Sequence, residues 1–513
     1  MLSVQAYADT EPDFAVDERM AEERETGERK AGERKLGEQK ADEWKVANRR
    51  RTNGRWANGR QTNGRQTNGR PQRGGEPMED KLQDEKLRIR EWVQLNRERV
   101  IEMLSELIRH DTVNKVISGS EKECQEALCM MLAELGLETE LYEPEQVPGF
   151  HEHPAYYPGK DYSGRPNVSA VWRGTGEGKS LLFSGHIDTA AVAPGWQGSP
   201  FQPVISGSKL YGLGAYDMKG GLVASILAVK CLMDLGLRLK GDVVIESVVD
   251  EEFGGANGTV AGRAHGIIAD AVIIPEPTNL ALYPATRGGA LWRVTFRGTT
   301  GLSFNGEEIR NPAVDAARFI LFLEQYEVLR AEKEGPAPWY SGRKEQLPII
   351  VTRLEAGDLK SPLCDVGPVE CHVDIWMECY PGVDEDQLRE ELLTGYRDFC
   401  GVRPGDGLAL PEFKRMIRFL PGSQVAADFP LIPLLAGEIE SATGQAAEVT
   451  GSPFACDAFV FNEYSNSPAL ILGPAGGNAH APGEYVDLDS LSVLIEIYAG
   501  AMLRWCGSSA AEL

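Results

Sequence analysis

Several histidines and carboxylates of this 513-residue chain follow short apolar segments, where they could act together on a substrate. The apolar run Leu181–Phe183 leads directly into Ser184-Gly-His-Ile-Asp-Thr189. His186 and Asp188 are two residues apart, so on an extended chain they project from one face. A carboxylate beside an imidazole can accept one ring N–H, which leaves the other nitrogen available to a metal. The alternative is a histidine at a strand end next to an ordinary turn aspartate.

Two more acidic segments lie further along the chain. Asp217 is surrounded by glycines in Tyr211-Gly-Leu-Gly-Ala-Tyr-Asp-Met-Lys-Gly-Gly221, and glycines allow close approach of the backbone. Their spacing does not match a phosphate-binding loop, which requires Gly-x4-Gly-Lys-Ser/Thr. The carboxylates of Asp250-Glu-Glu252 follow the apolar run Val243–Val249 and would repel one another unless a cation lies there. A capping aspartate and a solvated acidic turn are the alternatives.

Glu276 and His480 complete the candidate set. Glu276 lies between two prolines, which hold the backbone extended. His480 lies in Gly473-Pro-Ala-Gly-Gly-Asn-Ala-His-Ala-Pro-Gly-Glu484, after the apolar run Ala469–Leu472. Either residue alone could belong to a surface turn. Together the segments supply mixed nitrogen and oxygen ligands, which favour zinc, with Co²⁺ or Mn²⁺ as substitutes. Two metals sharing one carboxylate would account for the number of acids.

Buried strands that alternate with helices are needed to bring these residues together. Apolar periodicity predicts helices over residues 87–109, 121–135 and 221–235, and strands over residues 168–172, 180–183, 243–249 and 272–274. This alternation indicates an α/β fold, with a mixed, mostly parallel sheet flanked by helices. Most of the strands lead into one of the polar segments, at the end where such sheets bind their ligands.

Residues 288–420 show a different order of elements, βαββαβ. The predicted strands span 290–296, 348–354, 369–376 and 412–419, and the predicted helices span 313–328 and 385–399. This order predicts a ferredoxin-like α+β lid inserted into the catalytic domain, which residues 78–287 and 421–513 would form. Residues 1–77 have few apolar residues and a five-residue repeat, so we interpret them as a disordered low-complexity extension.

Four motifs of the chain carry a family resemblance. They are Ser-Gly-His-x-Asp, Gly-x4-Asp-Met-Lys-Gly-Gly, Asp-Glu-Glu-x-Gly-Gly and Gly-Gly-Asn-Ala-His-x-Pro-x-Glu. From about Leu87 to the C-terminus, the sequence resembles the family of acetylornithine deacetylase, succinyl-diaminopimelate desuccinylase, aminoacylase and glutamate carboxypeptidase. The resemblance implies a fold like that of the di-zinc exopeptidases, with two Zn²⁺ per chain.

The resemblance also implies a role for each residue of the site. One metal would be held by His186, Asp217 and Glu276. The other would be held by Asp217, Glu252 and His480, with Asp217 bridging the two. Asp188 would orient His186, and Glu251 would be the general base that takes a proton from water and passes it to the leaving nitrogen.

The lid departs from the family at one position. Relatives usually carry a histidine that helps to hold the scissile carbonyl, in the segment that here reads Gly298-Thr-Thr-Gly-Leu302. Leu302 stands in its place. Arg287, Arg293 and Arg353 are candidates for gripping a substrate carboxylate. For each of them a surface charge is the alternative.

The function that we predict is a metal-dependent amidohydrolase that cleaves the amide bond of an N-acyl amino acid. The alternatives are a dipeptidase or carboxypeptidase of the same family, and a metal-binding relative that is weakly active or inactive because of Leu302. The presence of Glu251 favours an enzyme, since an inactive site would not need its base. The resemblance further implies a homodimer formed through the lid.

Charge and cysteine content exclude other classes of protein. The formal net charge of −24 argues against nucleic-acid binding, because a polyanion would be repelled. No apolar stretch is long enough to predict a membrane span, and the first residues do not resemble a secretory signal. The nine cysteines are scattered and show no Cys-x-x-Cys, as expected for reduced thiols. We therefore predict a cytoplasmic location.

Overall fold

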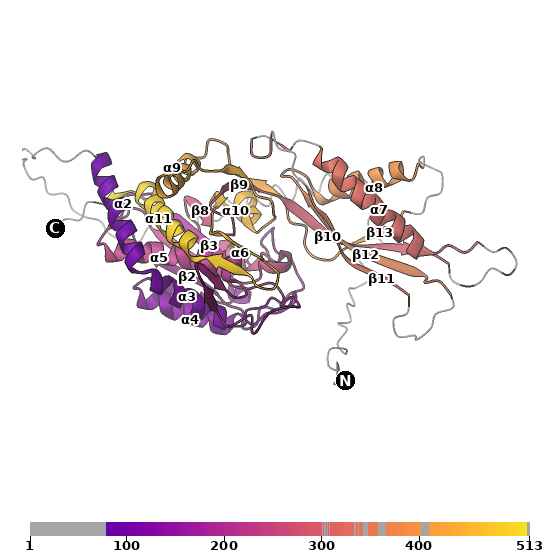
Figure 1. The fold of residues 1–513 in the computed structure, drawn as a ribbon, viewed down its shortest axis with the longest axis horizontal. Coiled ribbons are helices and arrows are strands. Elements are labelled where there is room, and N and C mark those ends of the chain that lie inside the picture. The colour runs from indigo at the N-terminus through magenta and orange to yellow at the C-terminus, as the bar shows by residue number, and fades with distance from the viewer. Residues whose placement is uncertain are drawn as a thin grey trace, which may run out of the picture.

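The computed structural model describes residues 78–299, 301, 304, 306, 308–332, 335–336, 338–341, 347–357, 366–401 and 410–509. The extension predicted over residues 1–77 lies outside these residues. Figure 1 shows a large part that contains the main sheet and its helices, and a smaller part that projects from one end.

The large part is built on one mixed sheet, in the order β1-β2-β7-β3-β8-β16-β9-β14, with β15 paired to β9. Its strands are β1 (Glu138–Tyr142), β2 (Asn167–Trp172), β3 (Leu181–His186), β7 (Val243–Val248), β8 (Ala271–Ile274), β9 (Leu282–Thr286), β14 (Ser423–Gln424), β15 (Val449–Gly451) and β16 (Ala469–Ile471). The neighbours β7, β3, β8 and β16 run parallel, whereas β1 and β2 are antiparallel at one side. The predicted fold class is therefore confirmed.

Helices cover both faces of this sheet. They are α2 (Met78–Leu95), α3 (Arg97–Arg109), α4 (Lys122–Glu134), α5 (Gly220–Asp234), α6 (Asn257–His265), α9 (Leu431–Thr443), α10 (Ala458–Tyr464) and α11 (Leu488–Trp505). Successive residues of a strand point to opposite faces. Phe183 accordingly packs in the same core as the apolar residues of α5 and α11, while Leu182 packs with Phe461 of α10. Burial on both faces explains why the central strands are continuous apolar runs.

The first predicted helix is two helices in the structure. α2 ends at Leu95 and α3 begins at Arg97, because the side chain of Asn96 donates a hydrogen bond to the carbonyl of Trp92 at 2.8 Å and interrupts the helix. An asparagine that bonds to nearby backbone favours a helix end over a helix interior.

The smaller part is the lid, which contains β10 (Gly288–Arg297), α7 (Pro312–Ala331), β11 (Ile349–Ala356), β12 (Glu370–Cys379), α8 (Glu385–Phe399) and β13 (Glu412–Arg415). Its strands form an antiparallel sheet in the order β11-β12-β10-β13, and it has a hydrophobic core of its own. β13 is shorter than the predicted strand over 412–419, because its regular pairing with β10 ends at Arg415 and only an isolated bridge joins Leu420 to Gly289. The division into domains at residues 287 and 420 stays our interpretation.

Two small sheets complete the fold. β4 (Val204–Ser206), β5 (Lys209–Tyr211), β18 (Tyr485–Asp487) and β17 (Gly476–Gly477) are joined in one antiparallel sheet, and β6 (Arg238–Leu239) pairs with β19 (Ser508–Ser509). The first of these sheets matters for the site, because it joins the glycine-rich segment of Asp217 to the loop of His480.

Two further predictions concern the environment of the protein. All eight cysteines in the described ranges are free thiols, as the sequence predicted for those residues. Within the same ranges no helix is long and apolar enough to cross a membrane. The cytoplasmic location stays a prediction.

His153 should make the fold sensitive to acid. Its side chain is buried, its Nδ1 accepts the N–H of Ala155 at 3.1 Å, and burial lowers the pKa of His153 to about 3. The unfolded chain would bind a proton near pH 6.5, so stability should be lost as the pH falls from 6.5 towards 3, by up to about 1.4 kcal/mol per pH unit. Between pH 7 and pH 5 this amounts to about 2 kcal/mol.

The control variant for this prediction is His153→Gln, whose side chain does not titrate. We expect the free energy of unfolding of the wild type to fall by about 2 kcal/mol more than that of the variant between these two pH values. Denaturant unfolding should be followed with chelator present, so that metal loss does not contribute. Equal losses in both proteins would show that His153 is not a source of acid sensitivity.

Candidate metal centre

The candidate residues meet because their strands are neighbours in the sheet. β7, β3, β8 and β16 are adjacent and parallel, so their carboxyl ends lie along one edge. His186 is the last residue of β3, Glu251 and Glu252 follow β7, Glu276 follows β8, and the loop of His480 follows β16. Ligands of open α/β sheets are bound at this edge.

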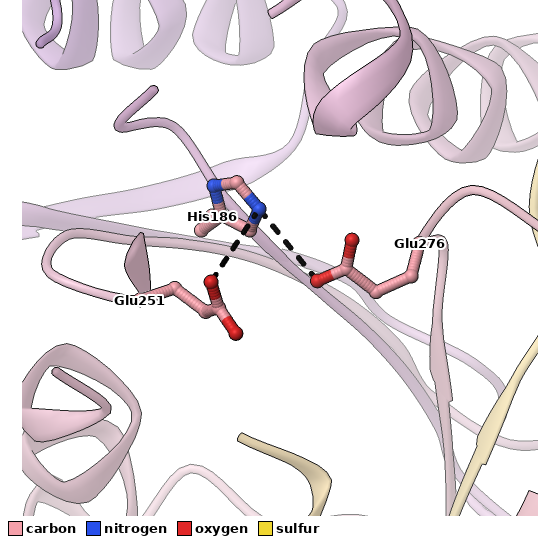
Figure 2. A group of neighbouring side chains, drawn as sticks. All are labelled: His186, Glu251 and Glu276. Carbon is pink, nitrogen blue, oxygen red and sulfur yellow. Dashed lines mark ion pairs between the residues drawn. The ribbon is translucent and has the colours of Figure 1, made fainter. Parts of the chain in front are cut away.

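The first group of side chains consists of His186, Glu251 and Glu276. Figure 2 shows the imidazole of His186 pointing towards both carboxylates. The Nε2 atom of His186 lies 3.6 Å from Oε1 of Glu276 and 3.9 Å from Oε2 of Glu251. One ligand atom from each of the three residues lies within 4.8 Å of the others, which is close enough for one ion to be shared.

The second group consists of Asp217, Glu252 and His480. The Nε2 atom of His480 lies 3.2 Å from Oδ2 of Asp217 and 3.2 Å from Oε1 of Glu252. The other oxygen of Asp217, Oδ1, lies 3.3 Å from Nε2 of His186 in the first group. Asp217 therefore presents one carboxylate oxygen to each group.

The loops that carry these residues use unusual backbone conformations. His480 has a φ of 58°, and Asp250, which precedes Glu251, has a φ of 63°. Non-glycine residues rarely adopt positive φ, and such conformations concentrate at functional sites.

Burial and mutual repulsion set the charge of the centre. Burial raises the pKa of Glu251 well above its usual value, which His186 opposes and Asp457 reinforces. Burial likewise raises the pKa of Glu276, again against the effect of His186. The carboxylates of Asp217 and Glu252, each with an oxygen 3.2 Å from Nε2 of His480, raise the pKa of His480 to about 11. Burial acts in the same direction on Asp217, but His186 and His480 outweigh it and lower the pKa of Asp217. Positive charge close to these carboxylates therefore stabilises their ionised forms.

The donor set fits metal ions. The Oε1 atom of Glu252 is buried and accepts no hydrogen bond from the described residues, although Nε2 of His480 lies 3.2 Å away. A cation between them would satisfy both atoms. Two imidazoles with several carboxylates are a ligand set that zinc, cobalt and manganese all accept.

Asp188 acts differently from the sequence-based prediction. Its backbone carbonyl, and not its carboxylate, is the hydrogen-bond partner of Nδ1 of His186, at 2.8 Å. The carboxylate accepts the backbone N–H groups of Glu251 and Glu252, each at 3.1 Å. Asp188 thus orients His186 through the main chain and holds the turn that carries the two glutamates with its side chain. The Oδ1 atom of Asp188 also lies 3.8 Å from Nδ1 of His186. The contact with the turn after β7 was not predicted, because that turn is distant in sequence.

Two residues near the centre were missed from the sequence. The side chain of Asn114 is buried and donates to Oδ2 of Asp188 at 2.9 Å and to the carbonyl of Glu252 at 3.1 Å. Asp457 is buried and influences the pKa values of Glu251 and Glu276. Asn114 follows a helix without any apolar run to mark it, so the sequence carried no signal for its position.

The three arginines considered for substrate binding have protein partners. Arg287 donates through NH1 to Oε2 of Glu378 at 2.9 Å and to the carbonyl of Pro453 at 3.2 Å. Arg293 forms a paired contact with both carboxylate oxygens of Asp374, at 2.8 and 2.9 Å. Arg353 lies on β11 of the lid, 62% exposed, with Nε 3.9 Å from Oε2 of Glu355. Leu302 lies outside the described residues.

A mixed sheet that brings imidazoles and carboxylates into two adjoining groups at its strand ends defines a metallohydrolase. The chain belongs to peptidase family M20/M25/M40, whose model matches residues 182–504. It is a hydrolase of that family acting on carbon–nitrogen bonds. The resemblance stated from the sequence motifs is thereby confirmed.

Curated relatives and a solved structure agree with this membership. The chain is 25% identical over 377 residues to N-formyl-4-amino-5-aminomethyl-2-methylpyrimidine deformylase of Bacillus subtilis, covering 67% of this chain and 84% of that protein. It is 27% identical over 352 residues to succinyl-diaminopimelate desuccinylase of Gluconacetobacter diazotrophicus, covering 64% and 82%. The structure of the dipeptidase Dug1p from Saccharomyces cerevisiae superposes with a TM-score of 0.63 at 14% identity, covering 83% and 99%, which supports the fold.

Replacing Asp217 should affect both groups at once. In Asp217→Asn the carboxylate becomes an amide, which cannot offer an anionic oxygen to each side. We expect metal affinity to fall by more than about tenfold, because this change removes a direct contact and loss of an outer partner alone costs that much. Metal content after dialysis against zinc, measured by atomic emission, should drop accordingly.

Asp234→Asn provides the control for this substitution. Asp234 lies on the surface side of α5, where it pairs with Lys230. This variant should keep the wild-type metal content. An Asp217→Asn protein that also keeps it would show that Asp217 does not bind metal.

Proposed function

We propose that the protein is a two-zinc amidohydrolase that removes the acyl group from an N-acyl amino acid. The observation that carries this proposal is the position of Asp217, whose Oδ1 faces His186 and whose Oδ2 faces His480. That arrangement supports the ligand assignment made from the motifs, in which Asp217 bridges His186 and Glu276 on one side and Glu252 and His480 on the other.

Glu251 is the general base in this proposal. Metal ions bound at the two groups would make water a better nucleophile at neutral pH and polarise the amide carbonyl. Glu251 lies 3.9 Å from Nε2 of His186, farther than Glu276 at 3.6 Å, which favours Glu251 over Glu276 as the residue that remains free for proton transfer. It accepts a proton from the attacking water and then donates it to the leaving nitrogen. Burial raises the pKa of Glu251, which helps it to hold that proton between the two steps.

The printed names of the curated relatives support deacylation. Both are named for removing a small acyl group, formyl or succinyl, from nitrogen. The solved structures are less than 25% identical, so the dipeptidases among them support the fold and not the substrate.

Turnover of a substrate panel tests the function. We expect the zinc- or cobalt-loaded protein to hydrolyse one or more N-formyl, N-acetyl or N-succinyl amines faster than dipeptides. Release of the free amine is the measurement. Faster cleavage of dipeptides would favour a peptidase, and no turnover at two bound metals per chain would favour the inactive relative.

Glu251→Gln distinguishes the base from a metal ligand in the same assay. A base contributes about 10²- to 10⁴-fold to the rate, so we expect a loss of kcat of that size with metal content unchanged. Loss of metal together with activity would assign Glu251 to the ligand set.

We further propose that the lid forms a homodimer with a second copy of the chain. α7 exposes the apolar side chains of Val314, Leu321 and Val328, which are seven residues apart and therefore share one face. β11 lies at the edge of the lid sheet and exposes Ile350 and Leu354. An edge strand with apolar side chains readily pairs with another chain.

Light scattering tests the dimer. We expect the wild type to have twice the mass of one chain in solution. Leu354→Lys should shift it towards the monomer, because a charge would be buried in the interface. Val204→Lys, an equally exposed position on β4 outside the lid, should leave the mass unchanged. A monomeric wild type would exclude the dimer.

A further inference from the structure

Glu484 is a buried carboxylate of the centre to which the metal assignment gives no role. It stands four residues after His480, at the end of the glycine-rich loop, and is 1% exposed. β18 begins at the next residue and pairs with β5, which leads into the segment of Asp217. Glu484 therefore lies where the loops of His480 and Asp217 meet.

The carboxylate of Glu484 accepts three backbone N–H groups from the Asp217 segment. Oε2 accepts the N–H of Gly214 at 3.0 Å. Oε1 accepts the N–H of Tyr216 at 2.9 Å and that of Asp217 itself at 3.1 Å. In addition, the N–H of Gly212 donates to the backbone carbonyl of Glu484 at 3.1 Å. Side chain and main chain of one residue thus fix the segment from Gly212 to Asp217.

The glycines of that segment make this contact possible. Gly214 has a φ of 76°, and a Cβ added there would lie 2.5 Å from Cγ2 of Thr189. Backbone N–H groups that converge around such a residue form a site for an anion. Here the anion is the carboxylate of Glu484. Because Glu484 already accepts these N–H groups, they are not available to a substrate phosphate or carboxylate.

These N–H groups donate the hydrogen bonds that hold the carboxylate of Glu484, and the buried ammonium group of Lys219 interacts with it electrostatically. Among the described residues, no lysine, arginine or histidine forms an ion pair with it. A buried carboxylate is costly unless it is hydrogen-bonded or paired, and Asp217, which adds a second negative charge, is in direct contact with it. A cation bound on the far side of Asp217 would offset the repulsion between the two acids.

We propose that Glu484 is a positioning residue that fixes Asp217 between the two metal-binding groups and keeps His480 in place beside Asp217. The inference rests on the proposed metal centre. Because Asp217 faces one group with each oxygen, a small rotation of its backbone would displace an oxygen from both. The contact from Glu484 to the N–H of Asp217 prevents that rotation, and the short link to His480 holds the second group together.

Metal affinity of Glu484 variants tests this role. We expect Glu484→Ala to weaken Zn²⁺ binding about ten- to a hundred-fold, as is usual when an outer partner of a ligand is lost. Glu484→Gln keeps one oxygen acceptor and should lose less. Zn²⁺ affinity is measured by competition with a coloured chelator, starting from metal-free protein. The visible absorption spectrum of the Co²⁺-loaded protein reports on ligand geometry and should change in Glu484→Ala.

Glu438→Ala is the matched control. Glu438 is equally buried on α9 and is paired with Lys86 and Arg504, which are not part of the centre. This variant should lose stability but keep the wild-type zinc affinity and cobalt spectrum. If Glu484→Ala behaves in the same way, Glu484 is merely structural and the inference is wrong. If the wild type itself binds neither ion, the proposed function fails together with it.

Discussion

Repulsion among buried carboxylates is the constraint on which the structure of this centre depends. Asp217, Glu251, Glu252 and Glu276 converge at one edge of the sheet, held by strands that cannot move apart without breaking the core. Two like charges at 4 Å repel by about 4 kcal/mol at an effective dielectric constant of 20. Bound cations, or protonation of some of these acids, relieve this repulsion. The geometry that builds the site therefore also favours the binding of cations there.

The acids around the centre are stabilised in two different ways. Asp188 and Glu484 accept backbone N–H groups from the segments that carry the candidate ligands. Asn114 adds an uncharged donor to Asp188. Oxygens of Glu276 and Glu252 instead face His186 and His480, respectively. Hydrogen-bond donors of the main chain thus satisfy the supporting carboxylates, which leaves the others to bind cations.

Sequence patterns singled out most of the candidate residues because they follow buried apolar strands, and parallel neighbours end at the same edge. Asp217, which precedes α5, was singled out by the glycines around it. The patterns failed where the partner is remote in the chain. The carboxylate of Asp188 bonds to a turn about 60 residues away, and Arg287, between β9 and β10, pairs with Glu378 on β12 of the lid. The periodicity of a short sequence segment cannot predict contacts between residues that are so far apart in the chain. Asn114 was missed for a related reason, since its role depends only on what the fold places beside it.

The lid is attached to the main sheet through two segments of the chain that lie side by side. Thr286 pairs with Ser423, and Gly289 pairs with Leu420, so the outgoing and returning chains lie side by side. Seen from the main sheet, the whole lid is the loop of a hairpin that joins β9 to β14. Such a connection imposes no limit on the length or sequence of what it carries. The lid could therefore be exchanged or enlarged during evolution without moving any of the candidate ligands.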